Sequence, residues 1–178
     1  MGELTPRERL QPSLLDRLTD NEPQKQEESR AGRVLPLARL REAVIRDLGW
    51  LLNCTNLFAT RHLEIDVETD LEKQYPLVAD SVLNYGLPDL TGVPSPNVDL
   101  HDLSRRLRQA IMRFEPRILP DSVQVSPVPD SETGHHNSLM FEITGELWAR
   151  PVPERLYLKT RVDLETGDFA VAENASGG

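Results

Sequence analysis

The residues best placed to do chemistry are the two charged ones that flank Pro116. Glu115 and Arg117 lie on either side of this proline, directly after an arginine-rich amphipathic stretch that Phe114 closes. A proline disfavours helical backbone at the residue before it, so the helix is expected to end at Glu115. One acid and one base then stand at the junction between two kinds of structure. Such a pair either locks the fold as an ion pair or contacts another protein, and both readings stay open.

Glycoside hydrolysis is the enzymatic reaction to weigh against these two roles, because it needs only two suitably spaced carboxyl groups. Its general acid must be held protonated, which takes an apolar pocket. Glu115 follows Phe114 and so has an apolar neighbour, but Arg117 favours the ionised carboxylate. With 29 Asp and Glu residues in the chain, some pair will match any spacing by chance. We therefore expect no enzyme and no catalytic residue, with a lysozyme-like peptidoglycan hydrolase as the alternative.

Other chemical sites are weakly supported by the sequence. His135 and His136 are adjacent in a loop-like stretch, and such neighbours rarely supply two ligands to one metal ion without further partners. No phosphate-binding or dinucleotide-binding motif occurs, so no cofactor is expected. The single cysteine, Cys54, excludes an internal disulfide. Because it follows an apolar helix, we expect its thiol to be buried rather than nucleophilic.

The net charge of −9 is unevenly distributed along the chain. The segment from His62 to Asp102 contains nine acidic residues and one lysine, Lys73. The next segment, from residue 105 to residue 117, contains five arginines and one acidic residue, Glu115. This separation favours docking on complementary protein surfaces, although an ordinary solvated helix face also explains the arginines. An acidic surface repels phosphate polymers, so nucleic acid is not expected as a partner. With no leader and no long apolar run, we expect a cytoplasmic protein without direct membrane insertion.

The chain divides into a flexible N-terminal docking segment (residues 1–32), one domain (33–173) and a disordered tail (174–178). Within the first segment, Leu14, Leu15 and Leu18 share a helical face after Pro12-Ser13. So short an amphipathic helix is not stable alone. Its leucines therefore need a groove, either on another protein or on this domain.

Two longer helices follow from apolar residues at three- and four-residue steps. The first spans residues 37–52, and Trp50 lies off its stripe, either packing on a second layer or anchoring an interface. The second begins after Asn97 or Asp99 and ends at Phe114. A shorter helix from Tyr75 to Leu83 should stop at residues 84–86, and Cys54 falls in the loop after the first helix. The predicted buried faces are Leu37, Leu40, Val44, Leu48 and Leu51 in the first helix, and Leu100, Leu103, Leu107, Ile111 and Phe114 in the second.

After Pro120 the apolar period becomes two, which is typical of strands. Strands are predicted around residues 123–125, 139–147, 156–164 and 169–171, with a tight turn at 165–168. A short edge strand is also predicted at 61–67. Helices followed by consecutive strands indicate an α+β fold, an antiparallel sheet of about three to four strands flanked by helices.

Four segments of the chain resemble the TssE family, whose members are the baseplate wedge subunits of the bacterial type VI secretion system. The wider family also includes the wedge protein of contractile phage tails. The Asn-Tyr-Gly-Leu-Pro-Asp and Glu-Pro-Arg segments together are specific. The four segments are Leu14-Leu15-Asp16-Arg17-Leu18, Leu40-Arg41-Glu42 through Leu51-Leu52-Asn53, Val82 through Asp89, and Phe114-Glu115-Pro116-Arg117.

The resemblance implies a structural role, joining other baseplate wedge subunits to the first ring of the contractile sheath, at the cytoplasmic side of the inner membrane. It implies that Glu115, Pro116 and Arg117 form the family's acid-proline-arginine signature, which either anchors the helix end or meets the sheath. An exposed sheet edge could accept a sheath strand, with the strand at 156–164 as the candidate, although the sequence does not identify which edge is open. The leucine-bearing N-terminal peptide would dock on the other wedge subunits.

Overall fold

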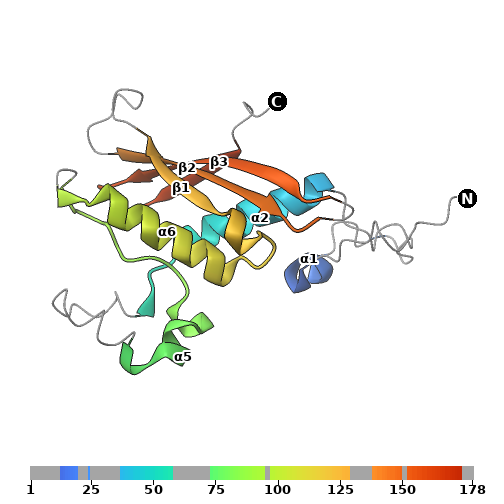
Figure 1. The fold of residues 1–178 in the computed structure, drawn as a ribbon, viewed down its shortest axis with the longest axis horizontal. Helices are drawn as coiled ribbons and strands as arrows, with labels where there is room; N and C mark the ends of the chain where they lie inside the picture. The colour runs from blue at the N-terminus through green and yellow to red at the C-terminus, as the bar shows by residue number, and fades with distance from the viewer. Residues whose placement is uncertain are drawn as a thin grey trace, which may run out of the picture.

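The computed structural model describes residues 13–19, 24, 37–57, 73–94, 97–128, 138–149 and 152–173. A four-stranded antiparallel sheet is covered on one face by two long helices (Figure 1), which confirms the predicted α+β fold. The strand predicted at 61–67 and the loop-like stretch that contains His135 and His136 lie outside the described residues. The elements are α1 (Leu14–Leu18), α2 (Leu37–Leu52), α5 (Pro76–Ala79), η3 (Val82–Asn84), α6 (Leu100–Phe114), η5 (Pro120–Ser122), β1 (Gln124–Val128), β2 (Ser138–Leu147), β3 (Glu154–Asp163) and β4 (Phe169–Glu173).

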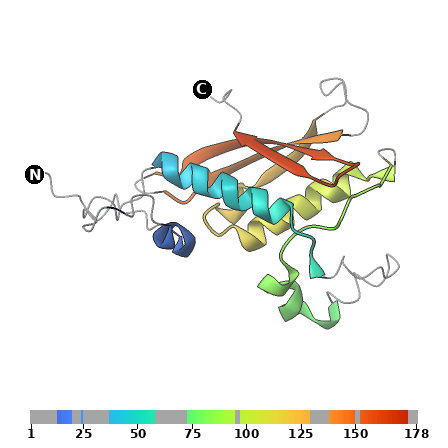
Figure 2. The ribbon, with the colours of Figure 1, turned by 180° about the vertical axis from the view of Figure 1, so that it is seen from behind.

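The helices α2 and α6 form where their apolar stripes predict. Asp99 is the N-cap of α6, and its carboxylate accepts the backbone N–H groups of His101 and Asp102. Both helices lie on the same face of the sheet (Figures 1 and 2), with α6 packed on β1 and α2 on β4. Most of the predicted positions are buried, but Leu37 and Leu100, in the first turns of their helices, are more than a third exposed. The core residues they share are Leu40, Val44, Leu48, Leu51, Leu103, Leu107 and Ile111.

The sheet runs in the order β1-β2-β3-β4, with each strand antiparallel to its neighbours. Alternate residues of β3 from Leu156 to Val162 are buried against the helices, while the residues between them are exposed or half-buried. The prediction that this strand forms an open sheet edge is wrong. β3 pairs with β2 on one side and with β4 on the other, because the turn at Gly167 folds β4 back along it. In the described part of the chain, β1 and β4 are the outer strands.

A small lobe projects from the two-layer body below α6 (Figure 1). The single helix predicted from Tyr75 to Leu83 is there divided into α5 and η3, since Asp80 and Ser81 turn the chain between them. The segment after η3 returns to the body at the end of α2, where the Leu87 N–H donates to the Cys54 carbonyl at 2.8 Å. The Asn56 N–H in turn donates to the Leu87 carbonyl at 3.0 Å. The lobe is therefore fastened to the body by backbone hydrogen bonds.

Two single-residue predictions are corrected by this arrangement. The Cys54 side chain is exposed rather than buried, because α2 ends at Leu52 and Cys54 lies in the turn beyond the apolar stripe. Trp50 is 51% exposed, so of its two predicted roles, packing on a second layer is wrong for the described structure. Its ring instead lies beneath the Arg46 guanidinium, 5.1 Å from the ring centroid.

We expect Gly86→Ala to destabilise the domain strongly. Gly86 has φ of +119°, a backbone conformation that other residues rarely adopt. An added Cβ would lie 2.1 Å from the Cys54 carbonyl oxygen, and this clash could be relieved only by moving the backbone. The free energy of unfolding should fall by about 3 kcal/mol, measured by urea denaturation. The control is Gly49→Ala within α2, where an added Cβ meets nothing within 4 Å; it should stabilise by about 0.5–1 kcal/mol. Equal, small effects of both substitutions would contradict the close packing of the two segments.

Candidate protein-interaction site

The site begins where α6 ends. The Glu115 N–H still donates to the Ile111 carbonyl at 2.9 Å, but Pro116 prevents a further helical turn, as predicted. This places Glu115 as the C-cap of α6, and the residue is only 3% exposed. A carboxylate so deeply buried needs a cation and hydrogen-bond donors close to it.

Arg117 supplies those donors. Its Nε donates to Glu115 Oε1 at 2.7 Å and its Nη2 donates to Glu115 Oε2 at 2.5 Å, a bidentate pair. The Arg117 backbone N–H adds a third bond to Oε1 at 3.1 Å. Pro116 thus holds the two charged residues on one tight turn, so that their side chains meet. The structure brings the sequence-predicted pair together as an ion pair.

The same guanidinium reaches a second helix. Arg117 Nη2 also donates to Asp47 Oδ2 at 2.6 Å, from a residue 70 positions earlier in α2. Asp47 Oδ1 accepts from Arg46 Nε at 2.8 Å, and Arg46 Nη1 donates to Asp16 Oδ1 of α1 at 2.8 Å. Five alternating charges therefore form one network, the charge ladder: Glu115, Arg117, Asp47, Arg46 and Asp16. It connects the end of α6 to α2 and then to α1.

The electrostatics of the ladder favour its charged forms. Partial burial acts to lower the pKa of Arg117, but hydrogen bonds and charges from Glu115 and Asp47 outweigh it and raise the pKa above the ordinary arginine value. Partial burial acts to raise the pKa of Asp16, yet hydrogen bonds from Ser13 and Arg46 outweigh it and lower the pKa. Both shifts favour the charged forms of Arg117 and Asp16.

The Asn-Tyr-Gly segment packs beside the ladder. The ring of Tyr85 meets Phe114 edge to face, with centroids 5.3 Å apart, and its hydroxyl lies 3.5 Å from the Asp47 carbonyl oxygen. Burial raises the pKa of the Tyr85 hydroxyl, which keeps it a neutral donor. The Asn-Tyr-Gly and Glu-Pro-Arg segments are separated in the sequence, yet both contact Asp47 of α2.

Two donors of the ladder are unused within the described structure. Arg117 Nη1 and Arg46 Nη2 are buried and have no hydrogen-bond acceptor among the described residues. A buried N–H without an acceptor costs about 1–3 kcal/mol, so these two donors lower the net stability that the ladder contributes within the described structure.

The three predicted docking leucines lie on α1. Ser13 caps this short helix, and Asp16 ties it to Arg46. Leu14, Leu15 and Leu18 are 70%, 42% and 73% exposed, so they are not packed into the core. The sequence placed these leucines and the Glu115–Arg117 pair, but it missed Asp47 and Arg46. Only their position beside the apolar stripe of α2 hinted at them, and nothing in the sequence linked α2 to residue 117.

Other kinds of site find little support in the part of the chain that is described. No group of three or more His, Cys and acidic side chains there could hold a metal ion. None of the described helices is both long and apolar enough to span a membrane. The described site is an ion-pair network that ends beside the exposed leucines of α1.

The family model for baseplate wedge protein gp25 matches residues 38–152, more than half of the chain. The chain therefore belongs to the baseplate wedge protein gp25 family. That family is a structural component of baseplates, which implies contacts with other baseplate proteins. The match begins in α2 and includes the Asn-Tyr-Gly segment, α6, Glu115, Pro116 and Arg117. No curated protein and no solved structure matches the chain significantly.

We expect Arg117→Ala to lower the stability of the isolated protein. Removing the guanidinium leaves Glu115 buried without its cation, which should cost about 3 kcal/mol of unfolding free energy in urea denaturation. Arg161→Ala, at an exposed position of β3, is the control and should change stability by less than about 0.5 kcal/mol. Arg117→Lys should recover part of the loss, since an ammonium cannot make the bidentate pair. An unchanged stability for Arg117→Ala would instead assign the pair to a partner interface.

We expect Arg46→Met to release α1 while the domain stays folded. A five-residue helix depends on tertiary contacts for its stability. The ion pair between Asp16 of α1 and Arg46 of α2 is such a contact. The heteronuclear NOE of Leu14–Leu18 should fall to that of a flexible chain. Arg41→Met is the control, because Arg41 pairs with Glu154 and Glu173 instead. An unaltered NOE in Arg46→Met would show that α1 is held by other contacts.

The same contact predicts a pH dependence. The pKa of Asp16 is lowered when α1 is docked, so the ion pair contributes in full above the ordinary aspartate pKa of about 3.9. Its contribution is lost as the pH falls through the lowered pKa. The NOE of α1 should therefore stay constant from pH 7 to about pH 4 and decline below that.

Proposed function

We propose that this protein is a non-enzymatic structural subunit of a type VI secretion system baseplate, acting in the cytoplasm at the inner membrane. It would link the other wedge subunits to the contractile sheath and support sheath assembly. The observation that carries the proposal is the family match across α2, the Asn-Tyr-Gly segment, α6 and the Glu115–Arg117 pair.

The N-terminal helix supports a docking role toward the wedge. Its leucines are turned outward while Asp16 fixes the helix to α2 through Arg46. An exposed leucine face held in place by a charged residue on its other side suits a partner groove, because part of the ordering entropy is already paid. We therefore assign Leu14, Leu15 and Leu18 to contacts with other wedge subunits.

The ladder supports a double role for the acid-proline-arginine signature. Glu115 is buried and internally paired, which favours the fold-locking reading. Arg117 Nη1 and Arg46 Nη2 still lack acceptors in the described structure, and exposed Trp50 lies beside Arg46. Exposed Trp50 beside Arg46 and the outward leucines of α1 beside Asp16 lie along the same ladder, so the paired residues also position a contact surface in this proposal.

The sheath contact is assigned to an outer strand of the sheet. Of the two outer strands in the described structure, β1 contains Pro127, which lacks an N–H group and is typical of protected edges. The other, β4, has the sequence Phe-Ala-Val-Ala-Glu and no proline, although the backbone N–H and carbonyl of Phe169 already bond the Asn53 side chain. We therefore propose that a sheath strand adds alongside β4 beyond Phe169 by β-augmentation.

The test is co-purification of the chain with co-expressed wedge subunits. Deleting residues 1–20 should leave a folded domain that no longer co-purifies, and replacing Leu14, Leu15 and Leu18 by serine should do the same. Val152→Ser removes another exposed apolar side chain and is the matched control, which should co-purify normally. Undiminished co-purification of the deletion variant would overturn the docking assignment.

The rival enzymatic function is tested on purified cell-wall material. A structural subunit should release no peptidoglycan fragments at any protein concentration tested. Turnover that Glu115→Gln abolishes would overturn the proposal and establish a hydrolase, since that substitution keeps the shape of the side chain and removes its acid.

A further inference from the structure

Asn53, the residue that follows α2, binds the backbone of β4 as a neighbouring strand would. Its Oδ1 accepts the Phe169 N–H at 2.8 Å, and its Nδ2 donates to the Phe169 carbonyl at 2.9 Å. In an antiparallel sheet, one residue of the next strand supplies this same pair of an acceptor and a donor. Nδ2 also donates to the Gly49 carbonyl at 2.7 Å, which fixes the amide on the last turn of α2. The Asn53 amide therefore takes the place of one strand residue beside Phe169.

The direction of the other backbone groups of β4 follows from the turn that precedes it. The Asp163 N–H donates to the Asp168 carbonyl at 3.0 Å, so these two residues face each other at a hydrogen-bonded position. Such positions recur at every second residue of an antiparallel ladder, so Ala170 and Ala172 bond to β3. The backbone groups of the alternate residues point away from β3, toward the outer edge of the sheet. These outward residues are Phe169, Val171 and Glu173.

The outer edge of β4 is thus closed at Phe169 and open beyond it. Asn53 occupies both outward groups of Phe169. The described residues supply no hydrogen-bond partner to the outward N–H and carbonyl groups of Val171 and Glu173. Unpaired backbone groups in a row on an outer strand are a template for another extended segment.

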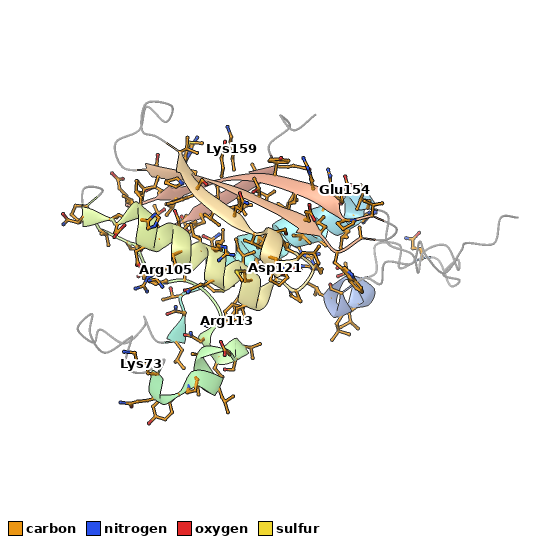
Figure 3. All side chains as sticks on the ribbon, viewed as in Figure 1. Lys73, Arg105, Arg113, Asp121, Glu154 and Lys159 are labelled. Atoms are coloured by element: carbon orange, nitrogen blue, oxygen red, sulfur yellow. The ribbon has the colours of Figure 1, made fainter. Side chains whose placement is uncertain are left out.

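The far end of β4 is held by a side chain and leaves the backbone uncovered. Arg41 of α2 pairs with the Glu173 carboxylate at 3.0 Å and with the Glu154 carboxylate of β3 at 2.6 Å. Figure 3 shows Glu154 at the end of the sheet nearest the first turns of α2. Two contacts with α2 therefore bracket the described edge, and only the one at Asn53 consumes backbone groups of β4.

The side chains of β4 give little to fix the register of an added strand. Ala170 and Ala172 are exposed, and both are small. Register is weakly specified along such a strand, and a slip of one residue turns every side chain of the added strand to the opposite face. A stop at one end limits the registers to those that end before Phe169, and the Asn53 amide is placed to act as that stop.

We propose that Asn53 is the register-determining residue for a strand that adds to β4. An incoming extended segment pairs with Val171 and Glu173 and ends before Phe169, because the amide already fills the next position. The occupant is an extended segment of another protein, and the inference rests on the proposed function only in naming that segment a sheath strand. Two paired residues provide few backbone bonds, so this contact sets position while the affinity comes from the remainder of the assembly.

The first test measures amide hydrogen exchange in the full-length protein by NMR. In Asn53→Ala the Phe169 N–H loses its acceptor and should exchange about ten-fold faster. Asn53→Asp keeps an oxygen at the same position, so this N–H should stay protected. Ala170 and Ala172 bond to β3 and are the internal references for any change in global stability. Unchanged exchange of Phe169 in Asn53→Ala would overturn the proposal.

The second test attaches a probe strand to the protein itself. A Thr-Val-Thr-Val-Thr segment is appended after Gly178 through a flexible Gly-Ser linker, which gives it about millimolar effective concentration. Its cross-strand NOEs should reach Val171 and Glu173 and stop there, and in Asn53→Ala they should extend to Phe169. NOEs to Phe169 with Asn53 in place, or the same NOEs in both backgrounds, would contradict the stop. A probe that pairs with β4 in neither background would show that the edge is not open and would also overturn the proposal.

Val171 gives the matched pair of control variants. Val171→Pro removes an outward N–H that β3 does not use, so the domain should fold while the probe loses its NOEs. Val171→Thr keeps the N–H and the β-branched shape, so the probe should still pair. A probe that pairs equally well in Val171→Pro is not bound to this edge, and that result would also count against the proposal.

Co-purification with co-expressed sheath subunits separates this inference from the proposed function. Val171→Pro should lose the sheath, and Val171→Thr should retain it. If the probe stops at Asn53 but Val171→Pro still retains the sheath, the assignment of the sheath to β4 is wrong and the role of Asn53 in setting the register stands.

Discussion

The buried carboxylate of Glu115 is the constraint on which the rest of the structure depends. It lies at the point where the helical layer gives way to the strands, and a buried charge is tolerated only with a cation and full hydrogen bonding. Arg117 provides both, and the one-residue spacer Pro116 makes the pair local and rigid. Because the guanidinium also holds Asp47, this single interaction fixes the end of α6 against α2. The interaction thereby fixes how the two helices of the layer lie against each other.

The charge ladder also connects the buried Glu115–Arg117 ion pair to the surface. From Glu115 it runs through Arg117, Asp47 and Arg46 to Asp16, and so from the core to the outward leucines of α1. Under the proposed function, folding and partner binding use one set of residues rather than two. Because a buried charged network is often less stabilising than apolar packing, we propose that this one is retained because it specifies a fixed geometry of the surfaces that contact other baseplate proteins.

Local sequence patterns predicted the elements and most of their core, since α2, α6 and the strands follow periodicity, caps and breakers that act within a few residues. The charged pair was predictable for the same reason, because only one proline separates its members. Local patterns did not predict the interior position of β3, the exposure of Cys54 or the charge ladder. Each depends on where distant segments meet: β4 folding back on β3, residue 87 reaching Cys54, and Arg117 reaching Asp47. Spacing along the chain carries no information on such contacts.

A double-mutant cycle between Asp47 and Arg117 tests most directly whether the Glu115–Arg117 ion pair also joins α6 to α2. The unfolding free energies of the native protein, Asp47→Ala, Arg117→Ala and the double variant are compared in urea. The structure predicts a favourable coupling of at least about 1 kcal/mol, because the two side chains share a hydrogen bond in one network. Additive effects, within about 0.3–0.5 kcal/mol, would contradict the lock and leave Arg117 as a residue that serves Glu115 alone.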